Sequence, residues 1–328
     1  MLPDAVPPAA AHSISVQVLG SADSTQRAEA QRLLADAQDA DGLIELSDQA
    51  RLSLGEDPRP DELVLLARGG AGTLEGFSSL LQRDGSWNLE TVVGADRRHD
   101  PDDVHGALVD AALDAIATRG GGCVGAWLRA PTERRARDLV RRGLQPRREL
   151  LQLRSDLPPE AVRDASTPPI PVRPFRPGRD EEAWLKVNAR AFADHPDQGS
   201  WTLADLERRE RQPWFDPGGF LLHELDGRLA GFCWTKIHRV PILGEIYVIG
   251  VDPDFQGRGL GRALARAGLG HLATRAVPTA MLYVESANIP ALVLYRSLGF
   301  SEHHRELQFT GDVPPRRQTD APTARPTP

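Results

Sequence analysis

The chain has 328 residues, of which 40% are hydrophobic and 26% charged, and its formal net charge is −7 at pH 7. This length favours two domains, and the negative charge argues against a nucleic-acid binder that relies on phosphate contacts. Only two cysteines occur, with no Cys-x-x-Cys motif and no His-x-x-x-His pair. The sequence therefore predicts no metal site, no disulfide framework and a cytoplasmic location. No apolar run approaches the length of a membrane helix, and the N-terminus does not resemble a signal peptide.

Proline-rich segments divide the chain into parts. Residues 1–12 and 312–328 are rich in proline and predict disordered ends. A third proline cluster at 156–170 predicts a linker between two folded units. The expected domains are therefore 13–155 and 171–311.

The first domain alternates between strand and helix patterns. Short apolar runs predict strands at Ser15–Val18, Leu63–Ala67 and Leu89–Val93, and a helix is expected around Gln26–Gln38. The domain ends with the segment Leu139–Leu144, in which a glycine follows two arginines.

The second domain repeats this order. A helix is predicted around Asp180–Phe192, followed by strands at Gly219–Glu224, Gly231–Lys236 and Gly244–Val251. The two halves therefore read as distant copies, each an α/β domain with a mixed central sheet flanked by helices.

The strand Gly244–Val251 leads into the most informative segment. It stops at Asp252-Pro253, and the segment Gln256–Arg262 then enters a helix through alternating glycines. Such a loop directs backbone N–H groups toward one point at a helix N-terminus, which predicts a pyrophosphate site. The spacing matches neither a Walker loop nor a dinucleotide fingerprint.

The pattern Gln-x-x-Gly-x-Gly in this loop resembles the acetyl-CoA loop of the GNAT acetyltransferases. A strand over Met281–Ser286 follows, with Asn288, then Tyr295 seven residues later and a closing Leu-Gly-Phe. In the GNAT family these features form the second half of the cofactor site.

Within the GNAT class, the second domain resembles the mycothiol synthase family most specifically, through residues 188–199, 214–219 and 234–238. This resemblance implies two fused GNAT domains, with catalysis in the C-terminal one. It implies acetyl-CoA as donor and the cysteinyl amine of a cysteine–glucosamine–inositol conjugate as acceptor. The arginine-rich composition suggests a GC-rich genome, which agrees with an actinobacterial source.

The resemblance also implies the contacts. It places acetyl-CoA at Ile249, Gly250, Val251, Gln256, Gly257, Arg258, Gly259, Leu260, Gly261, Arg262 and Asn288. It places the acceptor at Asp48, Asp197, Lys236, Glu245 and Tyr283, with Asp48 standing where the family has a glutamate.

Two side chains are candidates for the chemistry of amine acetylation. Glu245 is the expected general base, acting directly or through a water, because an α-amine with a pKa of about 7.7–8.0 needs only a modest base. Strand alternation predicts that Glu245, Tyr247 and Ile249 share one face. The family motif places Tyr295 as the acid that protonates the departing thiolate. A backbone N–H near Gly250 or Val251 is expected to polarise the thioester carbonyl.

The first domain is expected to be a degenerate copy. The segment 97–106, which corresponds to the glycine loop, holds a single glycine and three aspartates that would repel a pyrophosphate. Pro101 also removes one backbone donor.

Two alternative functions remain open at this level. One is a tandem acetyltransferase that acts on another amine, such as a protein N-terminus, a polyamine or an aminoglycoside. The other is a non-catalytic CoA-binding module, which the presence of Glu245 and Tyr295 disfavours. A monomer without nucleic-acid or membrane partners is expected.

Overall fold

The computed structural model describes residues 13–20, 22–43, 46–55, 61–83, 85–97, 104–129, 131–157, 169–193 and 198–316. The predicted acceptor contact Asp197 lies outside these residues, as do residues 98–103 of the first loop and the predicted disordered segment 1–12.

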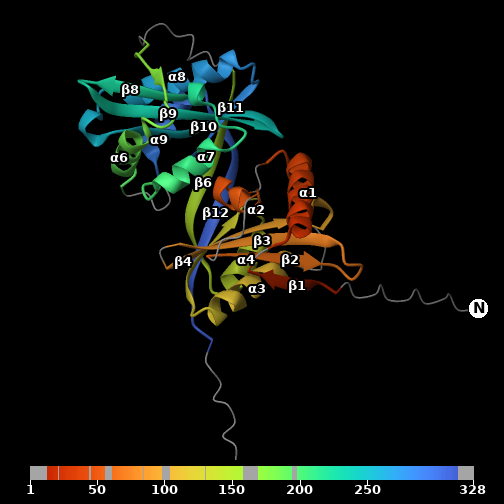
Figure 1. Cartoon of the computed structure of the whole chain (residues 1–328). Coiled ribbons are helices and arrows are strands. Elements are labelled where there is room, and N and C mark those ends of the chain that lie inside the picture. Colours follow the sequence, from red (N-terminus) through yellow and green to blue (C-terminus); the bar gives the residue numbers. More distant parts are fainter. Residues whose placement is uncertain are drawn as a thin grey trace, which may run out of the picture. The chain divides into compact units, whose positions relative to one another are not determined.

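Contacts divide the chain into two compact units (Figure 1). Unit 1 comprises Met1–Arg148 and Glu306–Pro328, and unit 2 comprises Glu149–Arg305. This division differs from the linear one expected from the proline clusters, because the last strand of each half pairs in the sheet of the other unit. A strand that ends at Asp156 pairs in unit 2, and a strand that continues to Val313 pairs in unit 1.

Unit 1 is a mixed sheet covered on both faces. Its strands, in spatial order, are β1 (Ser15–Leu19), β2 (Glu62–Arg68), β3 (Leu74–Arg83), β4 (Ser86–Val93), β5 (Gly122–Leu128) and β12 (Ser301–Val313). Its helices are α1 (Ser24–Asp41), α2 (Asp48–Gly55), α3 (Val104–Thr118) and α4 (Glu133–Arg141), with the short 3-10 helix η1 (Ala95–Arg97). Strands β4 and β5 run parallel, and the other neighbours run antiparallel.

The two faces of unit 1 are buried by different helices. Helices α1 and α2 pack over Leu66 and Phe77, whereas α3 and α4 pack over Leu65 and Leu80. Helix α1 begins at a capping box in which Asp23 accepts hydrogen bonds from the first-turn backbone. The fold class predicted for this half is confirmed.

Unit 2 repeats the plan. Its strands, in spatial order, are β6 (Gln145–Asp156), β11 (Thr279–Glu285), β10 (Ile242–Val251), β9 (Arg228–Arg239), β8 (Phe220–Leu225) and β7 (Arg173–Pro174). Its helices are α6 (Glu181–Ala191), α7 (Leu203–Glu210), α8 (Leu260–Thr274) and α9 (Ile289–Ser297), with the 3-10 helices η2 (Pro217–Gly219) and η3 (Pro253–Phe255). Strand β10 runs antiparallel to β9 and parallel to β11.

Each face of the unit 2 sheet has its own core. On the first, Leu264 and Leu269 of α8 and Leu292 of α9 pack over Ile246 and Leu282, and we call it the α8 face. On the second, which we call the α6 face, aromatic side chains gather under α6 and α7. There the Trp234 ring stacks on Phe220 at 4.2 Å, and Trp184 meets both rings edge-on.

Within the described ranges, no helix is both long and apolar enough to cross a membrane.

Glu210, at the end of α7, makes the stability of unit 2 depend on pH. Burial raises the pKa of this carboxyl to about 7, and repulsion from Glu181 and Glu207 adds to the shift. The folded state therefore retains a proton that the unfolded state releases between pH 4.5 and 7, so stability falls as the pH rises through that window.

Replacing Glu210 by glutamine is expected to increase the free energy of unfolding at pH 8 by about 1 kcal/mol, a value reduced for the solvent that screens a partly buried group. At pH 4 the variant and the parent should be equally stable, because both carry a neutral side chain there. Urea unfolding at the two pH values measures this difference. An equal gain at both values would assign the effect to packing, and Glu182→Gln on the exposed side of α6 is the control.

Candidate active site

Strands β10 and β11 part after a short parallel ladder. The ladder pairs Gly244 with Ala280 and Glu245 with Met281. Beyond it, β10 continues to Val251 while remaining hydrogen-bonded to β9 along its other edge. Because backbone groups alternate between the two edges of a strand, part of the β10 backbone faces the β11 side without a strand partner. An extended ligand with amide groups can bind there in the manner of a further strand.

A β-bulge at Tyr247 lies at the start of this separation. The register with β9 shifts between Ile246 and Val248, which leaves Tyr247 as the extra residue. Its hydroxyl accepts a hydrogen bond from Arg209 Nε at 2.9 Å, and its ring lies edge-on to Trp214. Helix α7 and the aromatic cluster therefore fix the bulge.

The bulge changes which side chains share a face of β10. Tyr247 packs with the aromatic cluster of the α6 face, whereas Ile249 packs against the core of the α8 face. Glu245 lies opposite Lys236, whose ammonium is 4.3 Å from the ring of Trp214, again on the α6 face. The expectation that Glu245, Tyr247 and Ile249 share one face is wrong for Ile249, because the extra residue reverses the alternation.

The glycine loop after β10 forms a hollow at the N-terminus of α8. Gly257 and Gly259 have φ values of 77° and 76°, in the left-handed region that favours glycine. A cavity of about 300 Å³ lies here, lined by Ala191, Phe192, Ile249, Gly250, Val251, Gln256, Gly257, Gly259, Leu260 and Gly261. Helix N-terminal N–H groups and small residues suit a pyrophosphate, so the residues present fit a CoA ligand.

Three predicted cofactor contacts lie outside the lining of this cavity. Arg258 is exposed and its guanidinium carbon is 5.5 Å from the Phe255 ring. Arg262 is half-buried in the first turn of α8. Asn288 caps α9, where its side-chain oxygen accepts a hydrogen bond from the backbone N–H of Ala291.

The loop is anchored at its base by a carboxylate that the sequence reasoning did not single out. Asp252 is 2% exposed and accepts two hydrogen bonds from Arg190 of α6, at 2.9 and 3.0 Å. It also accepts a hydrogen bond from the backbone N–H of Asp254. The end of β10 is thereby tied to α6, which holds the entrance of the loop in place.

Glu245 has a partner that the sequence reasoning also missed. The Nε2 atom of His238 is 2.6 Å from Oε2 of Glu245, and both side chains are about nine-tenths buried. The sequence contains part of the signal for this contact. His238 and Lys236 are two residues apart on one strand and therefore share a face, the face that Glu245 also occupies.

Tyr295 lies on the other face of the sheet. It is 7% exposed in the core of the α8 face, near the Cys233 thiol. Burial raises the pKa of the Tyr295 phenol far above its ordinary value, and it raises the pKa of the Cys233 thiol to about 12. Glu245 and Tyr295 can both reach a thioester only if it lies between the diverging strands.

The remaining predicted acceptor contacts lie in different places. Tyr283 accepts a hydrogen bond from Gln152 of β6 at 2.8 Å, and Gln152 in turn accepts one from Arg154. Lys236 is buried beside Trp214, as described above. Asp48 lies in the first turn of α2 in unit 1, so its role stays a prediction.

Unit 1 differs at each of these points. The β3–β4 hairpin of unit 1 aligns with the β9–β10 hairpin of unit 2 when the pair Gly76–Val93 is matched to the pair Gly231–Val251. In this alignment Asn88 takes the place of Glu245, and Leu81 takes the place of Lys236. The β3–β4 register carries no shift at the corresponding position. Strands β4 and β5 stay paired from Ser86 to Glu90, so the part of β4 that lacks a β5 partner is shorter than the part of β10 that lacks a β11 partner.

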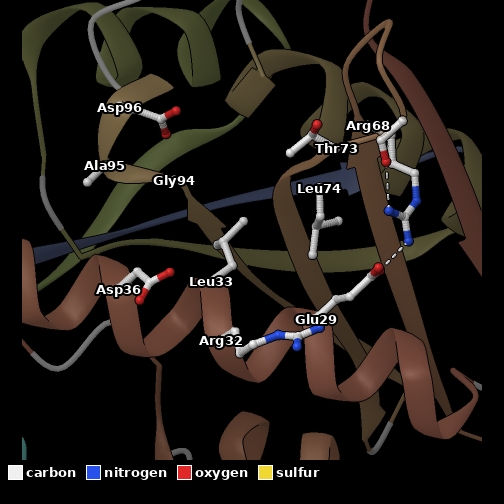
Figure 2. A pocket seen from close by; sticks show the side chains of 11 residues that line it. Glu29, Arg32, Leu33, Asp36, Arg68, Thr73, Leu74, Gly94, Ala95 and Asp96 are labelled. Carbon is white, nitrogen blue, oxygen red and sulfur yellow. Dashed lines mark hydrogen bonds and ion pairs between the residues drawn. The ribbon is translucent and has the colours of Figure 1, made fainter.

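A separate pocket of unit 1, about 580 Å³ in volume, lies beside α1 rather than at the start of α3 (Figure 2). Its lining includes the carboxylates of Glu29, Asp36 and Asp96, and Glu29 pairs with Arg68 at 2.5 Å. The same lining also holds the guanidinium groups of Arg32 and Arg68, so the charges around this pocket largely offset one another.

Among the described residues, no group of three or more His, Cys, Asp or Glu side chains is arranged to hold a metal ion.

The tandem α/β units, the parting strands and the glycine loop define a GNAT-type, acyl-CoA-dependent N-acetyltransferase. The family model for the acetyltransferase (GNAT) family matches residues 183–300. Two solved structures have the same fold. A GNAT N-acetyltransferase of Sphaerobacter thermophilus is 23% identical, with a TM-score of 0.69 over 92% of this chain and 96% of that one. A tandem GNAT protein from the clavulanic acid biosynthesis pathway has a TM-score of 0.71 at 16% identity, over 93% and 100% of the two chains.

Relatives in sequence identify the family within the GNAT acetyltransferases to which the chain belongs. The mycothiol acetyltransferase of Thermomonospora curvata is 44% identical over 277 residues, which cover 84% of this chain and 90% of the relative. That of Acidothermus cellulolyticus is 41% identical over 84% and 88% of the two chains. The chain belongs to the mycothiol acetyltransferase family, and the resemblance predicted from the sequence is confirmed.

Proposed function

We propose that this protein transfers the acetyl group of acetyl-CoA to the cysteinyl amine of a cysteine–glucosamine–inositol conjugate, the last step of mycothiol biosynthesis. The observation that carries the proposal is the position of Glu245. Its carboxylate lies at the last paired position before β10 and β11 part, on the strand that leads to the anion-binding loop.

The donor would be held by unit 2. The glycine loop and the first turn of α8 would receive the pyrophosphate, and the free edge of β10 would orient the arm that carries the thioester. Acetyl-CoA supplies an activated acyl group, so the protein has only to position the amine and move two protons.

Glu245 would accept one proton of the acceptor ammonium, which frees the nitrogen lone pair to bond to the acetyl carbon. The second proton would leave nitrogen as the tetrahedral intermediate collapses and would replace the proton that Tyr295 gives to sulfur. The proton held by Glu245 would then pass to solvent. The residue is 7% exposed, and little water competes for its carboxylate. Backbone N–H groups near Gly250 would stabilise the negative charge on the carbonyl oxygen.

Tyr295 would donate its proton to the sulfur as the carbon–sulfur bond breaks. Burial raises the pKa of Tyr295 above its ordinary value, so its proton would move to sulfur only as negative charge develops there with the breaking carbon–sulfur bond.

Acceptor recognition would rely on polar groups of the α6 face, since a sugar–inositol conjugate presents many hydroxyls. Lys236, Tyr283 and Glu245 itself are the candidates in unit 2 that the structure describes. Asp48 and Asp197 are the other two predicted contacts.

The test is an incubation of the protein with acetyl-CoA and the cysteinyl conjugate, followed by thiol detection of CoA and mass spectrometry of the product. We expect CoA release matched by one acetyl group on the amine. Faster turnover with a polyamine, an aminoglycoside or a peptide N-terminus would overturn the proposed acceptor. No turnover with any amine would favour a CoA-binding module.

One acetyl-CoA is expected to bind per chain, because the segment of unit 1 that corresponds to the glycine loop holds a single glycine and three aspartates. Calorimetric titration with acetyl-CoA measures the stoichiometry directly. Two equivalent tight sites would contradict the assignment of unit 1 as a degenerate domain.

We also propose that the protein acts in the cytoplasm as a monomer. Both cysteines are free thiols, which suits a reducing compartment. Both catalytic candidates, Glu245 and Tyr295, belong to unit 2 of one chain. Light scattering of the purified protein tests the monomer.

A further inference from the structure

We propose that His238 is a positioning residue for the general base: its Nε2–H fixes one oxygen of the Glu245 carboxylate so that the other oxygen meets the acceptor amine. This inference rests on the proposed function, in which Glu245 takes the amine proton.

The contact determines which atom carries the hydrogen. An ionised carboxylate has only acceptor atoms, so the 2.6 Å contact between His238 Nε2 and Glu245 Oε2 requires the proton to be on Nε2. The side chains are 11% and 9% exposed, so water has little access to replace this bond. The hydrogen bond is charge-assisted and therefore strong.

The strands make the arrangement rigid. Lys236 is the direct cross-strand neighbour of Glu245, and His238, two residues along β9, is its diagonal neighbour on the same face. The β9–β10 register is regular from Ile242 to Ile246, so the bulge at Tyr247 does not disturb the pair. Both side chains thus extend from paired strands rather than from loops.

The hydrogen bond from His238 determines which oxygen of the Glu245 carboxylate can take the proton of the amine. Within the described residues, Glu245 Oε2 is the oxygen that accepts a hydrogen bond, and Oε1 accepts none. Oε1 is therefore the oxygen available to an ammonium or to a bridging water. The proton taken from the amine would reside on Oε1, while His238 keeps its own proton throughout the step.

Two substitutions separate the hydrogen bond from the packing. His238→Leu preserves bulk but removes the donor, and His238→Gln retains an N–H donor at a similar distance from the backbone. We expect His238→Leu to lower kcat by about tenfold, the effect of losing one hydrogen bond to a charged group. KM for acetyl-CoA should stay unchanged, and His238→Gln should retain kcat within about twofold.

A double-mutant cycle tests whether His238 acts through Glu245. In a Glu245→Gln background, which lacks the base, His238→Leu should have little further effect on kcat. A full tenfold loss in that background, or a loss of kcat equal in His238→Gln and His238→Leu, would overturn the proposal and leave a packing role.

The pairing can also be tested without any acceptor. The shifts in urea midpoint caused by His238→Leu and Glu245→Ala should be non-additive in the double variant, because each removes the same contact. Additive shifts would overturn the proposal. If the shifts are non-additive but the parent protein shows no turnover, the result counts against the proposed acceptor. The pairing of His238 with Glu245 is then still supported.

Discussion

Replacing Glu245 by glutamine is expected to lower kcat for acetyl transfer by about 10²–10⁴-fold, the range that a positioned general base contributes. Glutamine has the same shape, and its side-chain oxygen can still accept the hydrogen bond from His238. It cannot take a proton at neutral pH. Glu245 is not part of the cavity lining, so the affinity for acetyl-CoA should remain that of the parent protein. Steady-state kinetics and calorimetry measure the two quantities.

The pH dependence distinguishes a base from a binding group. Above about pH 8 a free α-amine loses its proton without help, so the defect of the glutamine variant should shrink as the pH rises from 7 to 9. A defect that stays constant over this range would assign Glu245 to acceptor binding. Glu224→Gln provides the control, because Glu224 is also a hydrogen-bonded carboxylate of the same sheet but lies on β8, bonded to Arg173.

The features predictable from the sequence are those set by local chemistry. The glycine loop could be placed because positive φ values and close approach to an anion require glycine at fixed spacing. The structure brings Gly257, Gly259 and Gly261 to one cavity with the end of β10. Glu245 and Lys236 were predicted from the family resemblance, and in the structure they face each other across β9 and β10.

The features missed depend on contacts between distant segments. The bulge at Tyr247 is fixed by Arg209 and Trp214, which precede it by more than thirty residues, and alternation alone therefore misplaced Ile249. The pairing of His238 with Glu245 depends on the exact hairpin register. No local pattern predicts that β6 pairs with β11 in unit 2 and that β12 pairs with β5 in unit 1. Tertiary packing determines which strands pair.

Replacing Gly261 by aspartate is expected to raise the Kd for acetyl-CoA by about 10²–10³-fold, since a like charge about 4 Å from a phosphate costs about 4 kcal/mol in a partly screened site. Gly261 lies in the first turn of α8 and lines the cavity. A Cβ atom there would meet only Leu294, at an ordinary 3.8 Å. An acidic residue at a helix N-terminus also stabilises the helix, so the fold should persist or gain stability. Calorimetry measures the Kd, and thermal unfolding checks the fold.

Two further variants determine whether charge at this point is the cause. Gly261→Asn adds the same bulk without the charge and should weaken binding much less. Gly270→Asp places the same charge on α8 at a position where a Cβ meets nothing within 4 Å and which does not line the cavity. It should leave the Kd within about twofold, because exposed charges more than a Debye length apart are largely screened. Equal losses for aspartate and asparagine at 261 would mean that the cavity admits no added side chain, and the anion site would then have to be sought elsewhere along the free edge of β10.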